Sequence, residues 1–449
     1  MRVVVLGAGT VGRNIAAMLA QERHEVSVVD RNPDLIRQIE GELDVRGLVG
    51  EAAQSSVLFQ AGVSDADICL AVTGSDEANL VGASLAKAMG SRRAIARVFA
   101  PIYRDYSTFD YRRHFHIDRL LSLEHLAALE LARAIRGSEL FPMESLVQSE
   151  VEIQEVPIAD EVPAVGKPLK DLRLPPGVRV GAICRNGKWF IAGAEDRILV
   201  ADRVVLVGTR EEIAKVHDLF GIEHPELHVV IAGGGETGYH LAQLLDNRYF
   251  SVTLLESRRE RCDFLAAHLE RVTVLHADAQ QRTVLEEEHV GDADVFVACT
   301  GDDEDNIIAC VEALDLGVKR AMAIVARPDY ANVVRKLGIE VAISPRVVMA
   351  RQVRSFLTRG PVVSRIPLAE RSGIHVVEIE VPEQAPATQA QLADLRLPAQ
   401  VLVAALIREG YTWTPGAKDR IMPGDTVVLF MNDSAFEEVL ELFSADSGL

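Results

Sequence analysis

Residues 1–30 read MRVVVLGAGTVGRNIAAMLAQERHEVSVVD, and this stretch decides the fold of the chain. The uninterrupted apolar run Val3–Leu6 predicts a strand that is buried on both faces of a parallel sheet. A G-x-G-x-x-G pattern follows at Gly7–Gly12, and apolar side chains then recur at helical spacing over residues 11–19. A second apolar run ends on Asp30. Strand, glycine turn, helix and strand in this order are typical of a dinucleotide-binding unit.

The three glycines of this turn have separate physical roles. Gly7 permits the tight turn between strand and helix, Gly9 lets a pyrophosphate approach the main chain, and Gly12 lets the helix pack against the strand. The amino end of the helix offers N–H groups and a positive dipole end to a phosphate. Asp30 can accept hydrogen bonds from ribose hydroxyls and would repel a 2′-phosphate. The alternative is a tight turn without a ligand, with Asp30 as an exposed strand end. The predicted binding residues of this first cradle are Gly7, Ala8, Gly9, Thr10, Val11, Gly12 and Asp30.

The same unit occurs a second time, which makes an accidental match improbable. Val229–Ala232 leads into Gly233–Gly238, and a further apolar run ends on Glu256. In both copies the acid follows the first glycine by 23 residues. A carboxylate at Glu236 is unfavourable beside a pyrophosphate unless it points away. The predicted binding residues of this second cradle are Gly233, Gly234, Gly235, Glu236, Thr237, Gly238 and Glu256.

Strand and helix patterns continue to alternate after each cradle, which predicts an α/β fold with two doubly wound parallel sheets. Ligands bind such sheets beyond the carboxyl ends of the strands, where further polar residues of both copies would lie. These further candidates are Glu51, Thr73, Gly74 and Arg97 in the first copy, and Asp278, Thr300, Gly301 and Arg327 in the second.

Two pairs of these candidates have alternative interpretations. Thr73 and Thr300 can bind a phosphate or a ribose, or their loops can cap the next helix through Ser75 or Asp302. The arginine that ends the fifth strand of each copy can pair with a phosphate or form a surface salt bridge.

Each α/β unit is followed by a smaller segment, and the two small segments are related to each other. The sequence Asp-Leu-Arg-Leu-Pro occurs at 171–175 and again at 394–398. Each small segment has several short strand patterns and predicts a closing helix, at 211–220 and 435–443. Both therefore predict small α+β modules. The proline-rich stretches 157–168 and 361–386 are expected to be loops or hinges.

The composition limits the classes of partner and chemistry. The 449 residues carry a net charge of −19 and are 48% apolar, so we expect globular cores and no nucleic-acid partner. None of the five cysteines forms a C-x-x-C pair, which fits a reducing compartment, and no metal site is predicted. Met1 leads directly into the first strand, and no apolar run reaches roughly 20 residues. We therefore expect neither a signal peptide nor a membrane helix.

No pattern of a catalytic set stands out. The sequence lacks G-x-S-x-G, H-E-x-x-H and a P-loop lysine. We interpret His114 and His116 as partly exposed structural histidines, and the arginine pairs at 92–93 and 112–113 as solvated loop charges. The sequence therefore predicts binding without catalysis.

The order of the motifs is more specific than any one of them. The motifs in question are Gly7–Gly12 with Asp30, Thr73–Asn79, Ile95–Arg97 with Pro101 and Tyr103, Gly233–Gly238 with Glu256, Thr300–Asn306, Ile343–Pro345 and the two Asp-Leu-Arg-Leu-Pro segments. In this order they resemble the TrkA family of cytosolic regulators, which carry tandem RCK domains (regulators of potassium conductance). The resemblance covers essentially the whole chain.

The resemblance implies a division into domains and a class of ligand. RCK N-domains would span 1–122 and 226–345, and RCK C-domains 145–222 and 367–449. The stretches between them, 123–144 and 346–366, would be crossover helices with linkers. The N-domains would bind NAD(H) or ATP/ADP as regulatory ligands, and the cradle residues do not choose between these because both share the adenosine and the phosphates.

The resemblance also implies partners and a location. The chain would be a nucleotide-sensing regulatory subunit that gates a membrane-embedded Trk potassium channel or transporter subunit. It would be cytoplasmic, attached peripherally to the inner membrane, and assembled as a homotetramer (a dimer of dimers), with the helices at 123–135 and 347–357 as dimer-forming crossover elements. Two alternatives stay open: an RCK regulator of another potassium transporter or antiporter, and a tandem-Rossmann NAD-dependent oxidoreductase.

Overall fold

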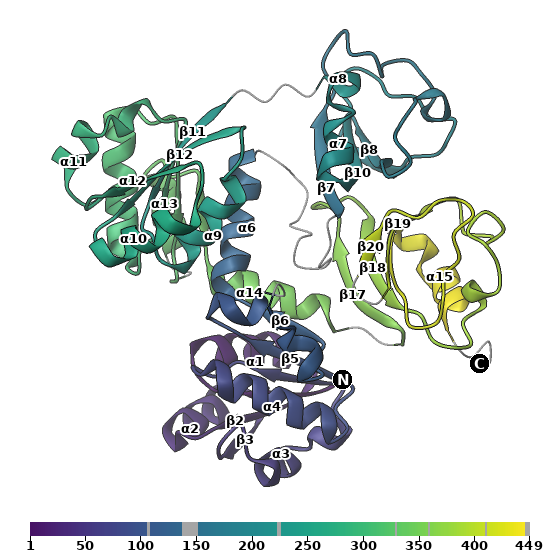
Figure 1. Ribbon diagram of the computed structural model, residues 1–449. Coiled ribbons are helices and arrows are strands. Elements are labelled where there is room, and N and C mark those ends of the chain that lie inside the picture. The colour runs from purple at the N-terminus through teal and green to yellow at the C-terminus, as the bar shows by residue number, and fades with distance from the viewer. Residues whose placement is uncertain are drawn as a thin grey trace. The chain divides into compact units, whose positions relative to one another are not determined.

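The computed structural model describes residues 1–105, 108–136, 151–221, 226–327, 330–357, 360–408 and 411–444 (Figure 1). The chain divides into two compact units, the first made of residues 1–132 with 226–357 and the second of 133–225 with 358–449. Much of the expected first linker, residues 137–144, and the start of the expected first C-domain lie outside the described residues.

The first unit contains a six-stranded parallel sheet of order β3-β2-β1-β4-β5-β6. The strand order reverses between β1 and β4, which makes this the switch point of a doubly wound sheet. The element bounds are β1 Arg2–Leu6, α1 Thr10–Gln21, β2 Glu25–Asp30, α2 Pro33–Glu42, β3 Arg46–Val49, α3 Ser55–Ala61, β4 Ile68–Ala71, α4 Asp76–Ala88, β5 Arg93–Arg97, α5 Tyr111–His114, β6 Arg119–Leu121 and α6 Leu123–Arg136.

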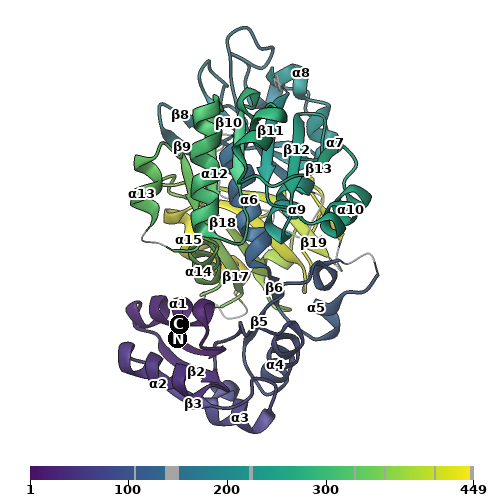
Figure 2. The same ribbon diagram turned by 90° about the vertical axis from the view of Figure 1, so that its left-hand side faces the viewer.

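Helices cover both faces of this sheet. Val4 and Leu6 of β1 pack into one core with residues of α3 and α4, and the alternate residues Val3 and Val5 face the other side. Figure 2 shows α1 and α4 on opposite sides of the strands. The helix α2, for which no bounds were predicted, begins where Asn32 caps it by accepting from the Asp34 N–H.

The second copy repeats this arrangement with the sheet order β13-β12-β11-β14-β15-β16. The predicted fold class and its duplication are therefore confirmed. The bounds are β11 Leu227–Ala232, α9 Glu236–Leu245, β12 Phe250–Glu256, α10 Arg259–His268, β13 Val272–His276, α11 Arg282–Glu287, β14 Val295–Ala298, α12 Asp303–Leu316, β15 Arg320–Ile324, α13 Ala331–Lys336, β16 Val341–Ile343 and α14 Pro345–Ser355.

The second unit contains two antiparallel sheets, of order β7-β10-β8-β9 and β17-β18-β21-β19-β20. One apolar core takes residues from both, including Ala182, Val205 and Phe430. The bounds are β7 Val151–Pro157, β8 Arg179–Arg185, β9 Lys188–Ile191, β10 Arg203–Thr209, α7 Arg210–Ala214, α8 His217–Phe220, β17 Val362–Pro367, β18 Ile374–Glu380, β19 Val401–Arg408, β20 Tyr411–Trp413, β21 Thr426–Asn432 and α15 Phe436–Phe443.

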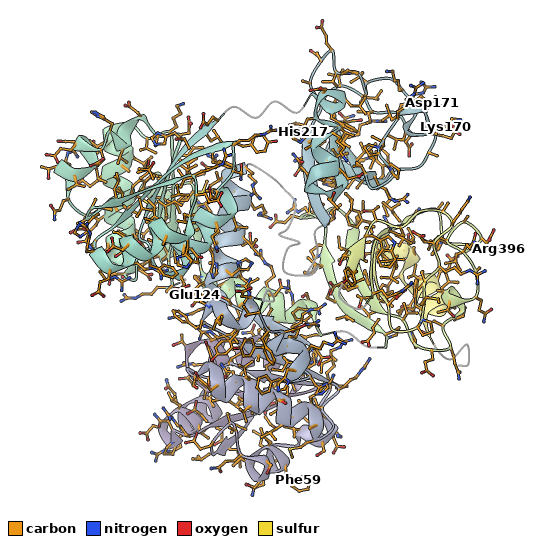
Figure 3. All side chains as sticks on the ribbon, in the orientation of Figure 1. Phe59, Glu124, Lys170, Asp171, His217 and Arg396 are labelled. Atoms are coloured by element: carbon orange, nitrogen blue, oxygen red, sulfur yellow. The ribbon has the colours of Figure 1, made fainter. Side chains whose placement is uncertain are left out.

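The two Asp-Leu-Arg-Leu-Pro segments occupy equivalent loops of these sheets. Figure 3 labels Asp171 and Arg396, one from each segment, on loops rather than on strands. An antiparallel bridge beside each segment, Pro168 to Arg197 and Gln391 to Arg420, holds the loop in place. The relation between the small modules that the sequence indicated is thus visible in three dimensions.

Three expectations about local structure were wrong. The stretch 361–386 is not a loop or hinge but carries β17 and β18, because its prolines flank or end these strands and leave the sheet interior free. The first closing helix is broken into α7 and α8. Arg93 is not a solvated loop charge: it is buried in β5, and its Nη1 donates to the Phe356 carbonyl over 3.0 Å.

Candidate nucleotide sites

The first glycine turn is tight enough to require glycine at two of its three positions. Gly7 has φ of +112°, in the left-handed region, and a Cβ there would lie 3.0 Å from the main-chain N of Thr73. A Cβ on Gly12 would lie 1.8 Å from the Gly7 carbonyl oxygen. A Cβ on Gly9 would meet nothing within 4 Å. The turn itself therefore requires Gly7 and Gly12, whereas Gly9 leaves open space beside the main chain.

The helix that follows this turn has a free amino end. Gly9 is its N-cap residue, and in the part of the chain that the structure describes no side chain caps α1. By contrast, α2, α4 and α12 are capped by Asn32, Ser75 and Asp302. The N–H groups of the first turn of α1 therefore keep their capacity to bind an anion.

Asp30 connects the end of β2 to the glycine turn. Its Oδ2 accepts from the Ala8 N–H over 2.7 Å, and its Oδ1 accepts from the Asn32 N–H over 2.8 Å. Each carboxylate oxygen can still accept from a second donor, because a carboxylate offers about four acceptor positions. The half-buried carboxylate is thus held in a fixed orientation beside the turn, and it fits a ribose diol.

The loop after β4 is organised by its own hydrogen bonds. The Thr73 hydroxyl donates to Asn79 Oδ1 over 2.7 Å, and the Ser75 hydroxyl caps α4 by accepting from the Ala78 N–H over 3.2 Å. The helix-cap interpretation of this loop is therefore observed. Gly74 is exposed, and a Cβ on it would meet nothing within 4 Å.

The second copy builds the loop after β14 in the same way. The Thr300 hydroxyl donates to Asn306 Oδ1 over 2.7 Å, and Asp302 Oδ1 accepts from the Asp305 N–H over 3.1 Å. A Cβ on Gly301 would also meet nothing within 4 Å. Both threonine hydroxyls are thus donors to an asparagine of the following helix.

The two candidate arginines bind carboxylates of the protein. Arg97 ends β5 as expected, but Arg327 does not end a strand, because β15 stops at Ile324. Arg97 Nη2 lies 3.4 Å from an oxygen of Glu124, which Figure 3 labels at the start of α6. The more exposed Arg327 donates to the Tyr330 hydroxyl over 2.7 Å and lies 3.4 Å from Glu304. The salt-bridge alternative is therefore observed in both copies, and pairing with a phosphate stays a prediction.

Glu51 and Asp278 follow the third strand of each sheet. The preceding residue in each case donates its N–H to the main-chain carbonyl of the cradle acid, Gly50 to Asp30 over 2.9 Å and Ala277 to Glu256 over 3.0 Å. The loops that carry the two acids thus begin beside the cradles. The Glu51 side chain is exposed, while Asp278 accepts from the Gln280 N–H over 3.1 Å.

The second glycine turn reproduces the backbone of the first. Gly233 has φ of +105°, and a Cβ on Gly238 would lie 2.0 Å from the Gly233 carbonyl oxygen. A Cβ on Gly235 would meet nothing within 4 Å, and no side chain among the described residues caps α9. Glu256 Oε2 accepts from the Gly234 N–H over 2.9 Å, as Asp30 does from Ala8.

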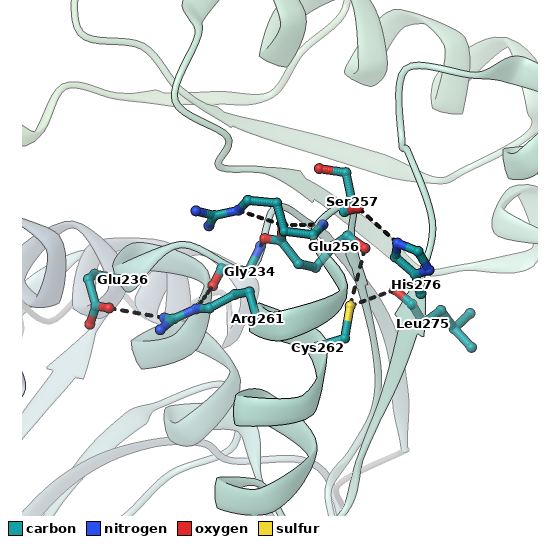
Figure 4. A network of polar contacts seen from close by, with 9 residues as sticks. Gly234, Glu236, Glu256, Ser257, Arg261, Cys262, Leu275 and His276 are labelled. Atoms are coloured by element: carbon teal, nitrogen blue, oxygen red, sulfur yellow. Dashed lines mark hydrogen bonds and ion pairs between the residues drawn. The ribbon is translucent and has the colours of Figure 1, made fainter.

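The second cradle differs from the first in the side chains around the turn. Glu236 contacts Arg261, with Oε1 3.0 Å from Nη2 (Figure 4). Arg261 Nε also donates to the Gly234 carbonyl over 2.6 Å. Sequence reasoning missed Arg261, although the run Ser-Arg-Arg-Glu-Arg at 257–261, directly after the acid, was a signal for it.

Comparison with known families matches all four domains. The TrkA-N domain family matches residues 3–109 and 229–345, and the TrkA-C domain family matches 153–221 and 376–444. The chain belongs to the TrkA family. The Trk system potassium uptake protein TrkA of Azorhizobium caulinodans is 32% identical to it, over 99% of this chain and 98% of the relative. A TrkA homolog of Archaeoglobus fulgidus is also 32% identical, over 99% and 100% of the two chains.

Solved structures share the fold of this TrkA-family chain. The GsuK channel bound to NAD superimposes with a TM-score of 0.60 at 18% identity, covering 99% of this chain and 79% of that one. GsuK bound to ADP gives a TM-score of 0.51 at 14% identity, covering 79% and 69%. Within the described ranges of the TrkA-family chain, no helix is both long and apolar enough to cross a membrane.

Proposed function

We propose that the chain is a nucleotide-sensing regulatory subunit of a Trk-type potassium uptake system. One observation carries the proposal: an uncapped helix amino end above a glycine turn, with a carboxylate fixed beside it, occurs twice in one chain. The family relatives, whose name is Trk system potassium uptake protein TrkA, supply the biological setting. The nucleotide acts as a signal, and the subunit performs no catalysis.

The proposed ligands are NAD(H) and ATP/ADP. GsuK, which shares the fold, has been solved bound to NAD and bound to ADP. The pyrophosphate lies on the amino end of α1 or α9. Asp30 or Glu256 accepts from the ribose hydroxyls, and this selects against a 2′-phosphate. The remaining predicted residues of both cradles border the adenosine and the phosphates.

The proposed mechanism is differential binding. A nucleotide shifts an equilibrium only by its difference in affinity for two conformations, and a coupling of roughly 1–3 kcal/mol changes gating about 5- to 150-fold. Arg97 is positioned to couple nucleotide binding to a change of conformation, because its ion pair with Glu124 connects the ligand edge of the sheet to the first turn of α6. A phosphate at this edge competes with Glu124 for the guanidinium.

The proposed assembly follows the family. Four chains form a ring of RCK domains at the cytoplasmic face of the inner membrane, with α6 and α14 as crossover helices. The ring contacts the membrane-embedded potassium-conducting subunit. The domain limits expected from the sequence remain part of this proposal.

The test is a titration of NADH and of ATP into the purified chain, followed by potassium flux measurements with the membrane subunit in vesicles. We expect binding that weakens in Asp30→Ala and Glu256→Ala, while Asp44→Ala, which removes an exposed carboxylate outside the cradles, binds like the wild type. We also expect the flux to change with bound nucleotide. Binding that is unaffected in both cradle variants, or a flux that no nucleotide changes, would contradict the proposal.

A further inference from the structure

The two cradles share a backbone but differ in charge at several equivalent positions, including one in the glycine turn and one in the helix after the second strand. Thr10 in the first glycine turn corresponds to Glu236 in the second. Leu35 in α2 of the first copy corresponds to Arg261 in α10 of the second. These two replacements contact each other in the second cradle. The first cradle has neither charge, so its turn stays open to a pyrophosphate.

The Glu236–Arg261 pair is held largely out of water. The two side chains are 15% and 17% exposed, and the guanidinium lies over the Phe264 ring at 4.7 Å and the Tyr239 ring at 5.7 Å. Arg261 Nε is also bound to the Gly234 carbonyl, inside the glycine turn (Figure 4). The ring contacts and the main-chain bond fix the guanidinium, so this pair is less screened than a surface salt bridge.

The Glu236 carboxylate lies at the amino end of α9, which is the kind of helix end that binds a phosphate. It lies in the first turn of α9, where the helix dipole favours a negative charge. Its Oε1 pairs with Arg261, while its buried Oε2 has no hydrogen-bond partner among the described residues. The carboxylate is thus an internal anion whose hydrogen bonds are only partly satisfied, and a phosphate with more acceptor oxygens can replace it.

The acid of the second cradle, Glu256, is also less exposed to solvent than Asp30, the acid of the first. Glu256 is 5% exposed, and its Oε1 accepts from both the N–H and the Nε of Arg258, over 2.8 and 3.1 Å. Its other oxygen is bound to the turn. Asp30, by contrast, is half-buried, and among the described residues its carboxylate accepts from the main-chain N–H groups of Ala8 and Asn32.

We propose that the ion pair of Glu236 with Arg261 is a latch that closes the second cradle, so that the two sites of one chain have unequal affinity for adenine nucleotides. This inference rests on the proposed function. A nucleotide enters the second cradle when its phosphates replace Glu236 as the partner of Arg261. The first cradle therefore fills at lower nucleotide concentration, and the second responds only when the concentration is high.

The latch predicts opposite effects for its two members. Glu236→Gln keeps the shape and removes the charge, so Arg261 becomes available to a phosphate and binding tightens. Arg261→Gln removes the phosphate partner and leaves the Glu236 carboxylate at the turn, so binding does not tighten. A pair that served stability alone would give no gain of affinity in either variant.

The experiment is calorimetric titration of the full-length chain with ADP and with NADH. Gly9→Val blocks the first cradle, because a Cβ there meets nothing within 4 Å and the side chain enters the open space that the ligand needs. In this background we expect ADP to bind at least tenfold more weakly than to the Gly235→Val chain, which keeps only the first cradle. Adding Glu236→Gln should tighten binding at least tenfold, whereas the matched control Glu260→Gln, exposed on the same helix as Arg261, should change nothing.

The outcomes separate the latch from the proposed function. Equal affinities of the Gly9→Val and Gly235→Val chains, or a Glu236→Gln variant that binds no tighter, would overturn the latch and leave nucleotide sensing intact. A wild-type chain that binds neither ADP nor NADH would overturn both. Thermal unfolding of each variant verifies that it is folded. Glu236→Gln removes the charge but keeps the size and shape of the side chain, so it should not disturb the turn.

Discussion

The buried side chain of Asn79 donates from Nδ2 to the main-chain carbonyl of Arg97 over 2.9 Å. Its Oδ1 accepts from the N–H and from the hydroxyl of Thr73, both over 2.7 Å. One amide on α4 thus joins the ends of β4 and β5 at the edge where the ligand is proposed to bind. Asn306 makes the corresponding bonds to Thr300. The Thr-to-Asn motif, Thr73–Asn79 in the first copy and Thr300–Asn306 in the second, therefore holds the strand ends together at this edge.

Replacing Asn79 with alanine should destabilise the first N-domain. The change leaves the partly buried N–H of Thr73 and the carbonyl of Arg97 without their partner, at a cost of about 2–3 kcal/mol in the free energy of unfolding. Urea denaturation measures this cost. Ala88→Ser, an exposed change at the last residue of the same helix, should stay within about 0.5 kcal/mol of the wild type. A loss equally small in Asn79→Ala would show that the amide is dispensable.

The repeated pattern made most of the fold predictable. Val3–Leu6 and its counterpart in the second copy are continuous apolar runs followed by glycine turns, and only a buried parallel strand combines these features. The Thr-to-Asn motif was recognised, but its Asn was not given a role. The reason is that its partner, the Arg97 carbonyl, lies on another strand and a main-chain acceptor leaves no mark in the sequence.

Other features depended on contacts between distant segments. Arg93 looked like a loop charge because its neighbour is also an arginine, and its burial depends on the Phe356 carbonyl, 263 residues away. The importance of Arg261 depends on the turn of Gly234, from which it is separated by the helix α9 and the strand β12. The prolines of 361–386 suggested a hinge, yet a strand such as β17 accepts a proline at its end.

Placing a carboxylate at the helix cap of the first cradle should separate stability from binding. Gly9→Asp gives α1 the capping side chain it lacks, which should raise stability by about 0.5–1 kcal/mol. The same carboxylate occupies the N–H groups that a pyrophosphate needs, so the tighter class of ADP sites should lose at least 100-fold in affinity. Thermal unfolding and calorimetric titration measure the two effects. Gly41→Asp, which adds the same charge at an exposed position of α2, should bind ADP normally, and equal binding by both variants would exclude the turn as the site.

The first C-domain should depend on one buried ion pair. Asp202, 1% exposed, accepts from Arg185 Nε and Nη2 over 2.9 and 2.7 Å and from the Leu199 N–H over 2.8 Å. Asp202→Ala removes the acceptor of Arg185 Nε and of the Leu199 N–H, while Arg185 Nη2 keeps its bond to the Arg197 carbonyl, and it should cost about 2–3 kcal/mol. Glu195→Ala breaks the exposed pair with Lys170 and should cost less than about 1 kcal/mol. Denaturant unfolding monitored by Trp189 fluorescence compares the free energies of unfolding of the two variants. Similar losses would contradict the claim that the buried Asp202 contributes more than an exposed ion pair.

His240 on α9 and His125 on α6 form a buried pair, with ring centroids 5.1 Å apart and planes at 85°. Burial, and next the nearby Arg104, lower the pKa of His240 from 6.5 to about 4. The same two causes lower the pKa of His125 well below its usual value. Folding therefore keeps both imidazoles neutral at pH values where the unfolded chain is protonated.

Acid should weaken this part of the chain through His240. Between pH 6.5 and 4 the unfolded state binds more protons than the folded state, so the free energy of unfolding falls as the pH falls, by about 2 kcal/mol between pH 7 and 5 from this group. In His240→Gln that part of the loss should disappear, even though the variant starts from a lower stability at pH 7. Urea unfolding at the two pH values measures the difference. His116→Asn, at an exposed residue whose φ of +54° suits asparagine, should keep the wild-type pH dependence. An unchanged pH dependence in His240→Gln would mean that its imidazole takes up a proton in the folded chain without cost.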